Sequence, residues 1–245
     1  MKRFFAADID PGADRVCLDR EESRHLARVL RLQVGQEIEV FDGAGALYTA
    51  EIETLGKQVI VKLKSREQGR EPADPSIIVC QGDLRGQKID FLVEKCTELG
   101  VDRFIPFVAG RSQGRPEAER RIKRLNRRNI IVKTACKQSG RLRLMDVDAD
   151  MDFADLIEAG AGEKQALKLF LWEMERKMTL RDAVGSKRFP TVYLMFGPEG
   201  GFSSAEADRA IAAGWQPVGL GDLILRAETA TIATVAVTRH LFGLI

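Results

Sequence analysis

The sequence predicts an α/β domain with a mostly parallel sheet, preceded by a small antiparallel β-domain. Between residues 36 and 64 the apolar residues follow a period of two, whereas beyond residue 76 short apolar runs alternate with segments of helical period. A polar stretch with two prolines, residues 65–76, separates the two patterns and is the predicted domain boundary. We therefore expect domains at residues 1–70 and 74–245.

The first domain is expected to contain one helix and three strands. Leu26, Val29 and Leu30 form an apolar stripe that predicts a helix over residues 21–32. The turn signals Asp42-Gly43-Ala44-Gly45 and Gly56-Lys57 join the strands that follow. These strands are predicted at residues 36–41, 46–53 and 58–64.

The second domain alternates strands and helices, which is the pattern of a parallel sheet. Its apolar runs are short and almost free of polar residues, as is typical of strands buried on both faces. We expect strands at residues 76–81, 103–108, 166–172 and 191–196, and helices at residues 87–100, 117–139 and 227–241.

Composition excludes several classes of protein. No apolar run approaches the roughly 18 residues of a membrane span, and residues 1–10 lack the apolar core of a signal peptide, so we expect a cytoplasmic protein. The four cysteines form no C-x-x-C pair and there are two histidines, so we expect neither a metal site nor a disulfide framework. Cys80 and Cys96 stand in apolar stretches and are predicted to be buried.

Positive charge is concentrated in one part of the chain. The formal net charge is +2, yet residues 103–143 carry 13 Lys and Arg against 2 Glu. Such a block indicates a polyanionic partner, usually a nucleic acid. The alternative is a solvated helix face.

A glycine-rich segment is the first candidate site. It reads Phe196-Gly197-Pro198-Glu199-Gly200-Gly201-Phe202-Ser203-Ser204-Ala205-Glu206, a buried strand followed by a loop and the S-x-x-E spacing of a helix capping box. Glycines allow close approach of the backbone to a ligand, and parallel sheets bind ligands at the carboxyl ends of their strands. The alternative is a tight connection without a ligand.

The second candidate site is the segment Leu220-Gly221-Asp222-Leu223-Ile224-Leu225-Arg226-Ala227-Glu228-Thr229-Ala230. Gly219 and Gly221 flank the end of a predicted short strand, and Arg226 and Glu228 lie in apolar surroundings at the junction of a loop and a helix. Charges in such places are rarely buried without a partner or a task. They either pair with each other or position a polar substrate.

Four motifs in order resemble one family. GPEGGFS-x-x-E and LG-x-x-ILR-x-ETA, together with KIDFLVEKCTELGVDRFIPF (residues 88–107) and KQSGR (137–141), resemble the RsmE-type 16S rRNA (uracil-N3)-methyltransferases of the SPOUT class. HLARVLRL-x-x-GQ (25–36) and VFDGAGALYTAEI (40–52) resemble the PUA-like RNA-binding barrel of that family. The pattern departs from the family at Lys137, where a glutamate is frequent, and at Ala109-Gly110-Arg111-Ser112.

The resemblance implies a small N-terminal PUA-like barrel and a C-terminal SPOUT domain, an α/β trefoil knot. It implies S-adenosyl-L-methionine (SAM) as cofactor, held by three loops. The residues expected to bind SAM are Leu171, Trp172, Glu173, Phe196, Gly197, Pro198, Glu199, Gly200, Gly201, Leu220, Gly221, Ile224, Leu225, Arg226 and Thr229.

The implied chemistry is methyl transfer to N3 of a uridine in 16S rRNA. N3 carries a proton and is a poor nucleophile until that proton leaves. The site therefore needs a base, or a cation that stabilises the anionic ring. We expect Arg226 to stabilise the charge on a uracil carbonyl oxygen. Glu199 or Glu228 is expected to orient the ring or accept the proton.

The resemblance also implies partners: 16S rRNA or the assembled small subunit, and a second copy of the chain against the apolar C-terminal helix. About six neutralised phosphates predict a log–log salt slope of roughly −5. The residues expected to contact RNA are Arg24, His25, Arg28, Arg31, Arg111, Arg115, Arg120, Arg121, Arg124, Arg127, Arg128, Gln138 and Arg141.

Two rival functions remain at this point. A SPOUT enzyme that methylates the ribose 2′-oxygen shares the knot but generally lacks the HLARVLRL element. A non-catalytic RNA-binding assembly factor shares the fold but need not keep glycine loops beside Arg226 and Glu228.

Overall fold

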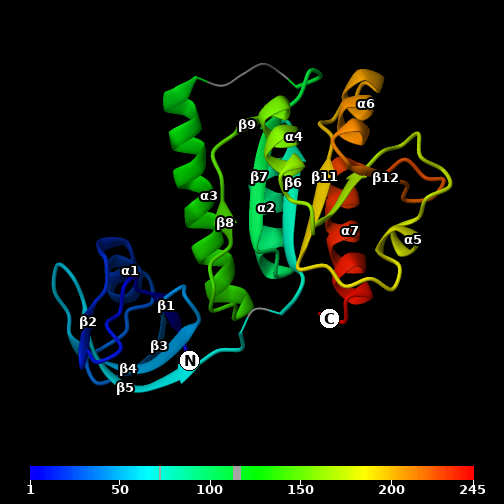
Figure 1. Cartoon of the computed structure of the whole chain (residues 1–245). Coiled ribbons are helices and arrows are strands. Elements are labelled where there is room, and N and C mark those ends of the chain that lie inside the picture. Colours follow the sequence, from blue (N-terminus) through cyan, green and yellow to red (C-terminus); the bar gives the residue numbers. More distant parts are fainter. Residues whose placement is uncertain (72, 113–116) are drawn as a thin grey trace. The chain divides into compact units, whose positions relative to one another are not determined.

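The computed structural model describes residues 1–71, 73–112 and 117–245 (Figure 1). Its contacts divide the chain into two compact units. One comprises Met1–Glu71 with Lys133–Leu144, and the other Pro72–Val132 with Met145–Ile245. The first unit thus includes residues far along the chain, which a single boundary in the sequence does not represent.

A five-stranded sheet forms the N-terminal unit. Its strands β3, β4, β5 and β2 pair antiparallel in that order, and β1 pairs parallel to β3. In the central strand β4 every second side chain points to the same face, and Ala46, Tyr48, Ala50 and Ile52 are accordingly buried in one core. The three predicted strands are confirmed, and two short ones were not predicted. The bounds are β1 Arg3–Phe5, β2 Arg15–Cys17, β3 Glu37–Phe41, β4 Ala46–Thr54 and β5 Ile60–Gln68.

The helix predicted over residues 21–32 is shorter than expected. Asp19 caps α1 (Arg20–Arg24) by accepting a hydrogen bond from the Glu22 amide, and a π-helical turn, η1 (His25–Val29), follows. Leu26 is buried in the core of the unit. The helix ends because Arg31 adopts a positive φ of 54°.

The C-terminal unit is built on a parallel sheet in the order β12-β10-β11-β6-β7-β8, with β9 also paired to β7. All four strands that were predicted with bounds in this domain are present. β12 is the short strand expected at Gly219 and Gly221, whereas β8 and β9 were not predicted. The bounds are β6 Ser76–Gly82, β7 Arg103–Val108, β8 Asp146–Val147, β9 Met151–Asp152, β10 Leu167–Leu171, β11 Thr191–Phe196 and β12 Gln216–Val218.

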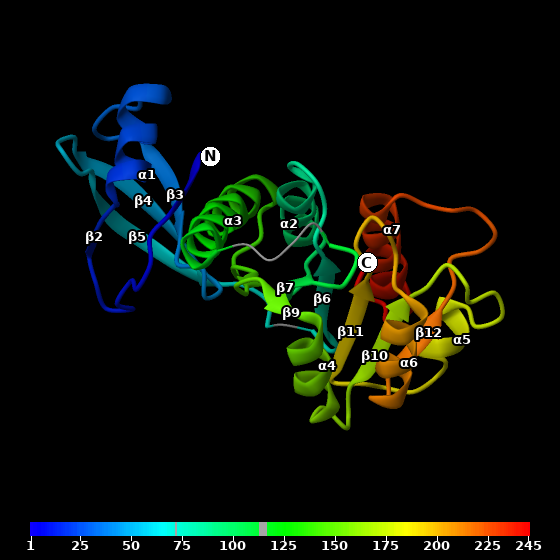
Figure 2. The same cartoon turned by 90° about the horizontal axis from the view of Figure 1, so that it is seen from above.

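Helices cover both faces of this sheet (Figure 2). Helices α2 and α7 lie on one face and pack against each other. Helices α4 and α6 lie on the other, where Phe153, Leu156 and Ala207 share a core with Cys80 and Met195 of the strands. The bounds are α2 Lys88–Glu98, α3 Ala118–Ser139, α4 Phe153–Ala161, α5 Leu180–Val184, α6 Ser204–Ala212 and α7 Ala227–Leu241.

The predicted fold class is confirmed: an α/β unit with a parallel sheet accompanies a separate N-terminal sheet. Cys80 and Cys96 are buried as predicted, and burial raises the pKa of both thiols. Within the described residues, no helix is both long and apolar enough to cross a membrane. Because the strands of the second sheet are parallel, their carboxyl ends share one edge, where a ligand is expected.

Candidate active site

The glycine-rich loop after β11 is tightly packed against neighbouring backbone. A Cβ added at Gly82 would lie 2.4 Å from the Pro198 nitrogen, and one at Gly197 would lie 3.3 Å from the Gly201 backbone. Gly201 has a φ of +66°, which few other residues adopt. The loop then enters α6, where Ser203 and Glu206 form the predicted capping box. The backbone course of this loop therefore depends on its glycines.

A second loop follows β12, on the far side of β10. A Cβ added at Gly219 would lie 2.2 Å from the carbonyl oxygen of Glu175, so only glycine allows the two segments to meet. The Gly219 amide donates a hydrogen bond to the Met178 carbonyl at 3.0 Å. The segment after β10 and the segment after β12 thus support each other.

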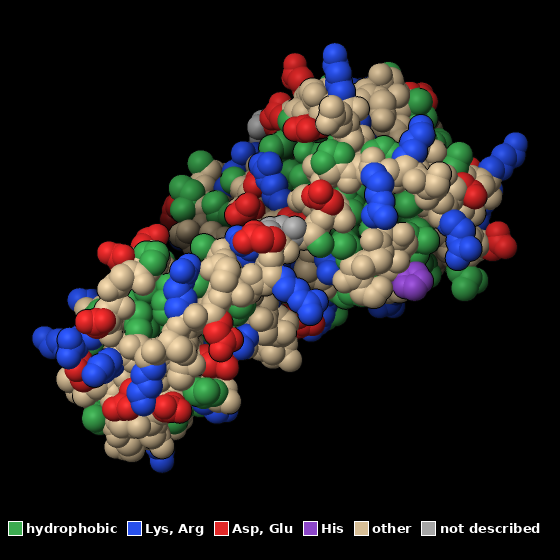
Figure 3. Space-filling model, turned by 60° about the horizontal axis from the view of Figure 1, so that its bottom comes forward, with side chains coloured by type: hydrophobic (Ala, Val, Ile, Leu, Met, Phe, Trp, Pro, Cys, Tyr) green, Lys and Arg blue, Asp and Glu red, His purple; other side chains and the backbone are tan. Residues whose placement is uncertain are grey.

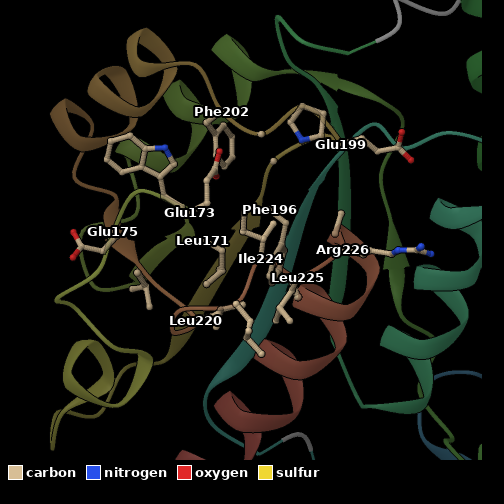
Figure 4. Close-up of a pocket in the computed structure, with 18 of the residues that line it drawn as sticks. Leu171, Glu173, Glu175, Phe196, Glu199, Phe202, Leu220, Ile224, Leu225 and Arg226 are labelled. Carbon is tan, nitrogen blue, oxygen red and sulfur yellow. The ribbon is translucent and has the colours of Figure 1, made fainter.

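These loops enclose a cavity of about 540 Å³ at the carboxyl edge of the sheet (Figure 4). Leu171, Phe196 and Leu225 contribute apolar side chains from three different segments. At the rim, Leu223 and Ile224 are 79% and 87% exposed, which is unusual for large apolar side chains. An apolar cavity with such a rim is suited to a flat, mostly apolar ligand.

The cavity brings together fourteen of the fifteen residues predicted to bind a cofactor. Thr229 is the exception: it is exposed on α7 and does not line the cavity. Phe202, Leu223, Ala227 and Ala230 also line the cavity and belong to the two candidate segments, although they were not predicted to bind the cofactor. Four further lining residues were not predicted at all: Lys88, Glu175, Arg176 and Val218. Most of these adjoin predicted positions, whereas Lys88 comes from a distant helix and no local signal marks it.

The two candidate carboxylates are joined by Lys88. Its Nζ donates to Glu199 Oε1 at 2.8 Å and lies 3.6 Å from Glu228 Oε1. Arg85 Nε lies 3.4 Å from the other oxygen of Glu199. The hydrogen bond from Lys88 is the main cause that lowers the pKa of Glu199. Glu199 is therefore an ionised hydrogen-bond acceptor rather than a group poised to take up a proton.

Arg226 is exposed at the N-terminus of α7, and its side chain extends to the same side of the cavity as Glu199 (Figure 4). It has no ion pair with Glu228 or with any other described carboxylate. The first alternative for these two charges, a mutual ion pair, is thus not what the structure shows. A guanidinium without a protein partner at the rim is available to a ligand.

Removal of Lys88 tests the coupling of these charges. In Lys88→Met we expect the Glu199 carboxylate to titrate at higher pH than in the wild type, because the hydrogen bond that lowers its pKa is lost. Carbon-13 NMR of the glutamate side chains, assigned with Glu199→Gln, measures both titrations. Coincident curves for the wild type and the Lys88→Met variant would contradict the coupling.

A buried polar network links α7 to the glycine-rich loop. Thr231 Oγ1 donates to Gln81 Oε1 at 2.7 Å, and Gln81 Nε2 donates to the Gly197 carbonyl at 3.2 Å. Both side chains are fully buried. The network fixes the loop after β11 relative to the N-terminal half of α7.

Disruption of this network is expected to destabilise the protein. In Thr231→Val the Gln81 carbonyl loses its donor while still buried, which costs about 1–3 kcal/mol of unfolding free energy. Chemical denaturation measures the loss. Thr229→Val, an equivalent change at an exposed position of the same helix, serves as the control and is expected to stay within about 0.5 kcal/mol of the wild type.

Among the described residues, at least seven cations of the basic block 103–143 form ion pairs within their own unit. Arg128 is the clearest correction: its side chain is 3% exposed and pairs with Asp150, so a phosphate does not reach it. Acidic and basic side chains are interspersed on the face drawn in Figure 3. The pairs are Arg103–Asp148, Lys123–Glu119, Arg124–Asp150, Arg127–Asp90, Arg128–Asp150, Lys137–Glu22 and Arg143–Glu71.

The other residues predicted to contact RNA fall into several groups. Arg111 donates to the Gly200 carbonyl at 2.8 Å and so supports the glycine-rich loop. Arg141 donates to the Arg143 carbonyl, and Arg115 lies outside the described residues. Arg121 is partly buried. Gln138 lines a cavity of the N-terminal unit. Arg24, His25, Arg28, Arg31 and Arg120 are exposed, as Arg111, Arg127 and Gln138 also are.

Fold and cavity together define an RNA methyltransferase of the SPOUT class. Residues 71–239 match the family model of the RNA methyltransferase domain, and residues 18–64 match that of the RNA methyltransferase PUA domain. The chain belongs to the ribosomal RNA small subunit methyltransferase E family, as its motifs predicted. It is 32% identical over 222 residues to that enzyme from Synechocystis sp., with 90% of this chain and 71% of the relative covered.

Solved structures agree with this assignment. The ribosomal RNA small subunit methyltransferase E from Neisseria gonorrhoeae, bound to S-adenosyl methionine, is 31% identical and has a TM-score of 0.87, with 98% of each chain covered. A methyltransferase from Legionella pneumophila in complex with SAM is 29% identical and has a TM-score of 0.89, with 97% of this chain and 96% of that chain covered.

Proposed function

We propose that the protein is a cytoplasmic SAM-dependent methyltransferase that modifies N3 of a uridine in small-subunit (16S) ribosomal RNA. The observation that carries this proposal is the cavity at the carboxyl edge of the parallel sheet, with apolar walls, two glycine-dependent loops and Arg226 at its rim. The names and bound cofactors of its relatives support the same function.

The residues of the cavity fit SAM. Leu171, Phe196 and Leu225 offer apolar surfaces for an adenine ring, and the closely packed glycines leave backbone groups accessible for its edge. Glu173 supplies a carboxylate in the same cavity, which is compatible with a cationic ligand. When bound, SAM supplies a methyl group on a sulfonium that a ring nitrogen can attack.

The remaining residues at the rim prepare the nucleophile. Glu199, ionised and held by Lys88, accepts a hydrogen bond from the N3–H of uracil and so orients the ring. The N3 proton passes to solvent at the exposed rim of the cavity, and Arg226 stabilises the negative charge that this leaves on the carbonyl oxygens, as a preorganised cation does for a developing oxyanion. Glu228 does not line the cavity, and we assign it a positioning role through Lys88.

Binding of RNA is expected to depend on salt. The exposed cations Arg24, Arg28, Arg31 and Arg120 are candidates for phosphate contacts. Six neutralised phosphates predict a log–log slope of roughly −5, and these four arginines alone predict about −3 to −4. Affinity measured from low to physiological salt gives the slope, and an affinity insensitive to salt would refute the electrostatic contribution.

We further propose that the enzyme is a homodimer that uses the outer face of α7. One face of this helix is buried through Thr231, Thr234, Val235 and Thr238, whereas Val237 is 47% exposed. Light scattering of the purified chain measures the oligomeric state, and a monomer at micromolar concentration would contradict this part.

The decisive experiment is transfer of labelled methyl from SAM to small subunits that lack the modification. Digestion to nucleosides and mass spectrometry identify the methylated atom, and N3 of uridine is the expected result. Methyl on a ribose 2′-oxygen would instead identify the rival SPOUT activity. Calorimetry with SAM separates both enzymes from a non-catalytic RNA binder, which would release no heat.

A further inference from the structure

A second cavity, of about 810 Å³, lies within the N-terminal unit, and no residue of the proposed reaction lines it. Its walls come from residues 1–3, from α1 and the π-helical turn, from Glu39 of β3, and from the end of α3 with Gly140. The lining residues that are important for the argument are Glu22, His25, Val29, Leu30, Lys137 and Gln138. The cavity therefore combines apolar, cationic and anionic groups.

One ion pair in its wall leaves a hydrogen-bonding group unsatisfied. Lys137 Nζ donates to Glu22 Oε1 at 2.6 Å. The side chain of Glu22 is 7% exposed, and its Oε2 is buried without a hydrogen-bond partner among the described residues. A buried carboxylate oxygen without a donor is costly, so a ligand that brings an N–H group to it is favoured.

The pair presents a specific pattern of donors and acceptors. The Lys137 ammonium retains donors beyond the one used on Glu22. The terminal torsion of a glutamate is broad, so the Glu22 carboxylate can turn its free lone pairs toward the cavity while it keeps Lys137. Lys137 thus offers a hydrogen-bond donor, and the Glu22 carboxylate beside it can accept two hydrogen bonds.

We propose that this cavity binds an unstacked guanine base of the RNA substrate. Guanine presents a carbonyl oxygen, O6, followed by two donors, N1–H and the 2-amino group, which complements Lys137 and Glu22. Adenine and cytosine offer an amino donor beside an acceptor, and uracil a single imino donor. Guanine thus makes one hydrogen bond more than any other base.

The apolar part of the lining suits the face of a base. His25 is exposed, with its ring 6.2 Å from that of Phe4, and Val29 is 64% exposed. Unpaired RNA bases stack on aromatic side chains, including histidine, while their edges are read by hydrogen bonds.

This inference rests on the proposed RNA substrate, and its test separates the two. The full-length protein is titrated calorimetrically with GMP, IMP, AMP, CMP and UMP, with S-adenosylhomocysteine saturating the other cavity. Because a good bidentate contact discriminates by about 1–3 kcal/mol, GMP is expected to bind at least about fivefold tighter than the other nucleotides. IMP, which lacks only the 2-amino group, isolates the second hydrogen bond to Glu22 without any change in the protein.

The variant Glu22→Gln is expected to weaken GMP binding about tenfold and to abolish the preference over IMP, since an amide offers one acceptor oxygen. Lys57→Ala, at an exposed turn of the same unit, is expected to bind like the wild type. Equal affinities of GMP and IMP in the wild type would overturn the guanine site, and normal methylation of small subunits would then leave the proposed function intact. A GMP preference without methyl transfer would instead refute the enzyme and keep the site.

Discussion

Arg226→Ala is expected to lower the turnover number for RNA methylation by about 10²- to 10³-fold, the loss typical for removal of one group that stabilises a developing oxyanion. Arg226 lies at the rim of the cavity and has no ion pair among the described residues. Its charge is therefore available to a substrate. Single-turnover methyl transfer at saturating SAM and RNA measures the effect on the chemical step.

Two controls separate this effect from binding and folding. The affinity for SAM, measured by calorimetry, is expected to change by less than about fivefold, a small free energy of about 1 kcal/mol. Arg188→Ala removes an exposed arginine of the same unit, away from the cavity, and is expected to be silent. Near-wild-type turnover in Arg226→Ala would exclude the proposed role.

Much of the second unit is predictable because its signals are local. The strand Thr191–Phe196 and the helix Ala227–Leu241 have the bounds that apolar runs and their flanking residues predict. Glycine-rich loops at the ends of parallel strands must lie at one edge of the sheet, and this fact alone brings residues 196–201 and 220–226 to one cavity.

The wrong or missing predictions concern residues whose interaction partners are distant in sequence, so no local signal reveals them. The sequence around Arg128 is typical of a solvated cation, and only the folded structure places Asp150 beside it. Lys88 likewise contacts Glu199 only because folding brings the two residues together. Strands β1 and β2, of three residues each, are too short for alternation to be visible. A period-3.6 pattern likewise does not distinguish the α-helical turn of α1 from the π-helical turn that follows.

Gly219→Ala is expected to reduce the affinity for SAM by about 10- to 100-fold, because a methyl group that overpacks a closely fitted site costs about 1–3 kcal/mol. The new Cβ would lie 2.2 Å from the Glu175 carbonyl oxygen. That oxygen belongs to backbone, so relief requires movement of one of the two segments that line the cavity. Calorimetric titration with SAM measures the loss.

The matched control is Gly162→Ala in the same unit. Its Cβ would meet only the Ala159 carbonyl at 3.7 Å, an ordinary contact, and its φ of −70° suits any residue. We expect this variant to bind SAM like the wild type and both variants to keep the circular dichroism of the folded protein. If Gly219→Ala binds SAM normally, then the close approach of the two segments is not what shapes the cofactor cavity, and the loop after β12 tolerates displacement without loss of the site.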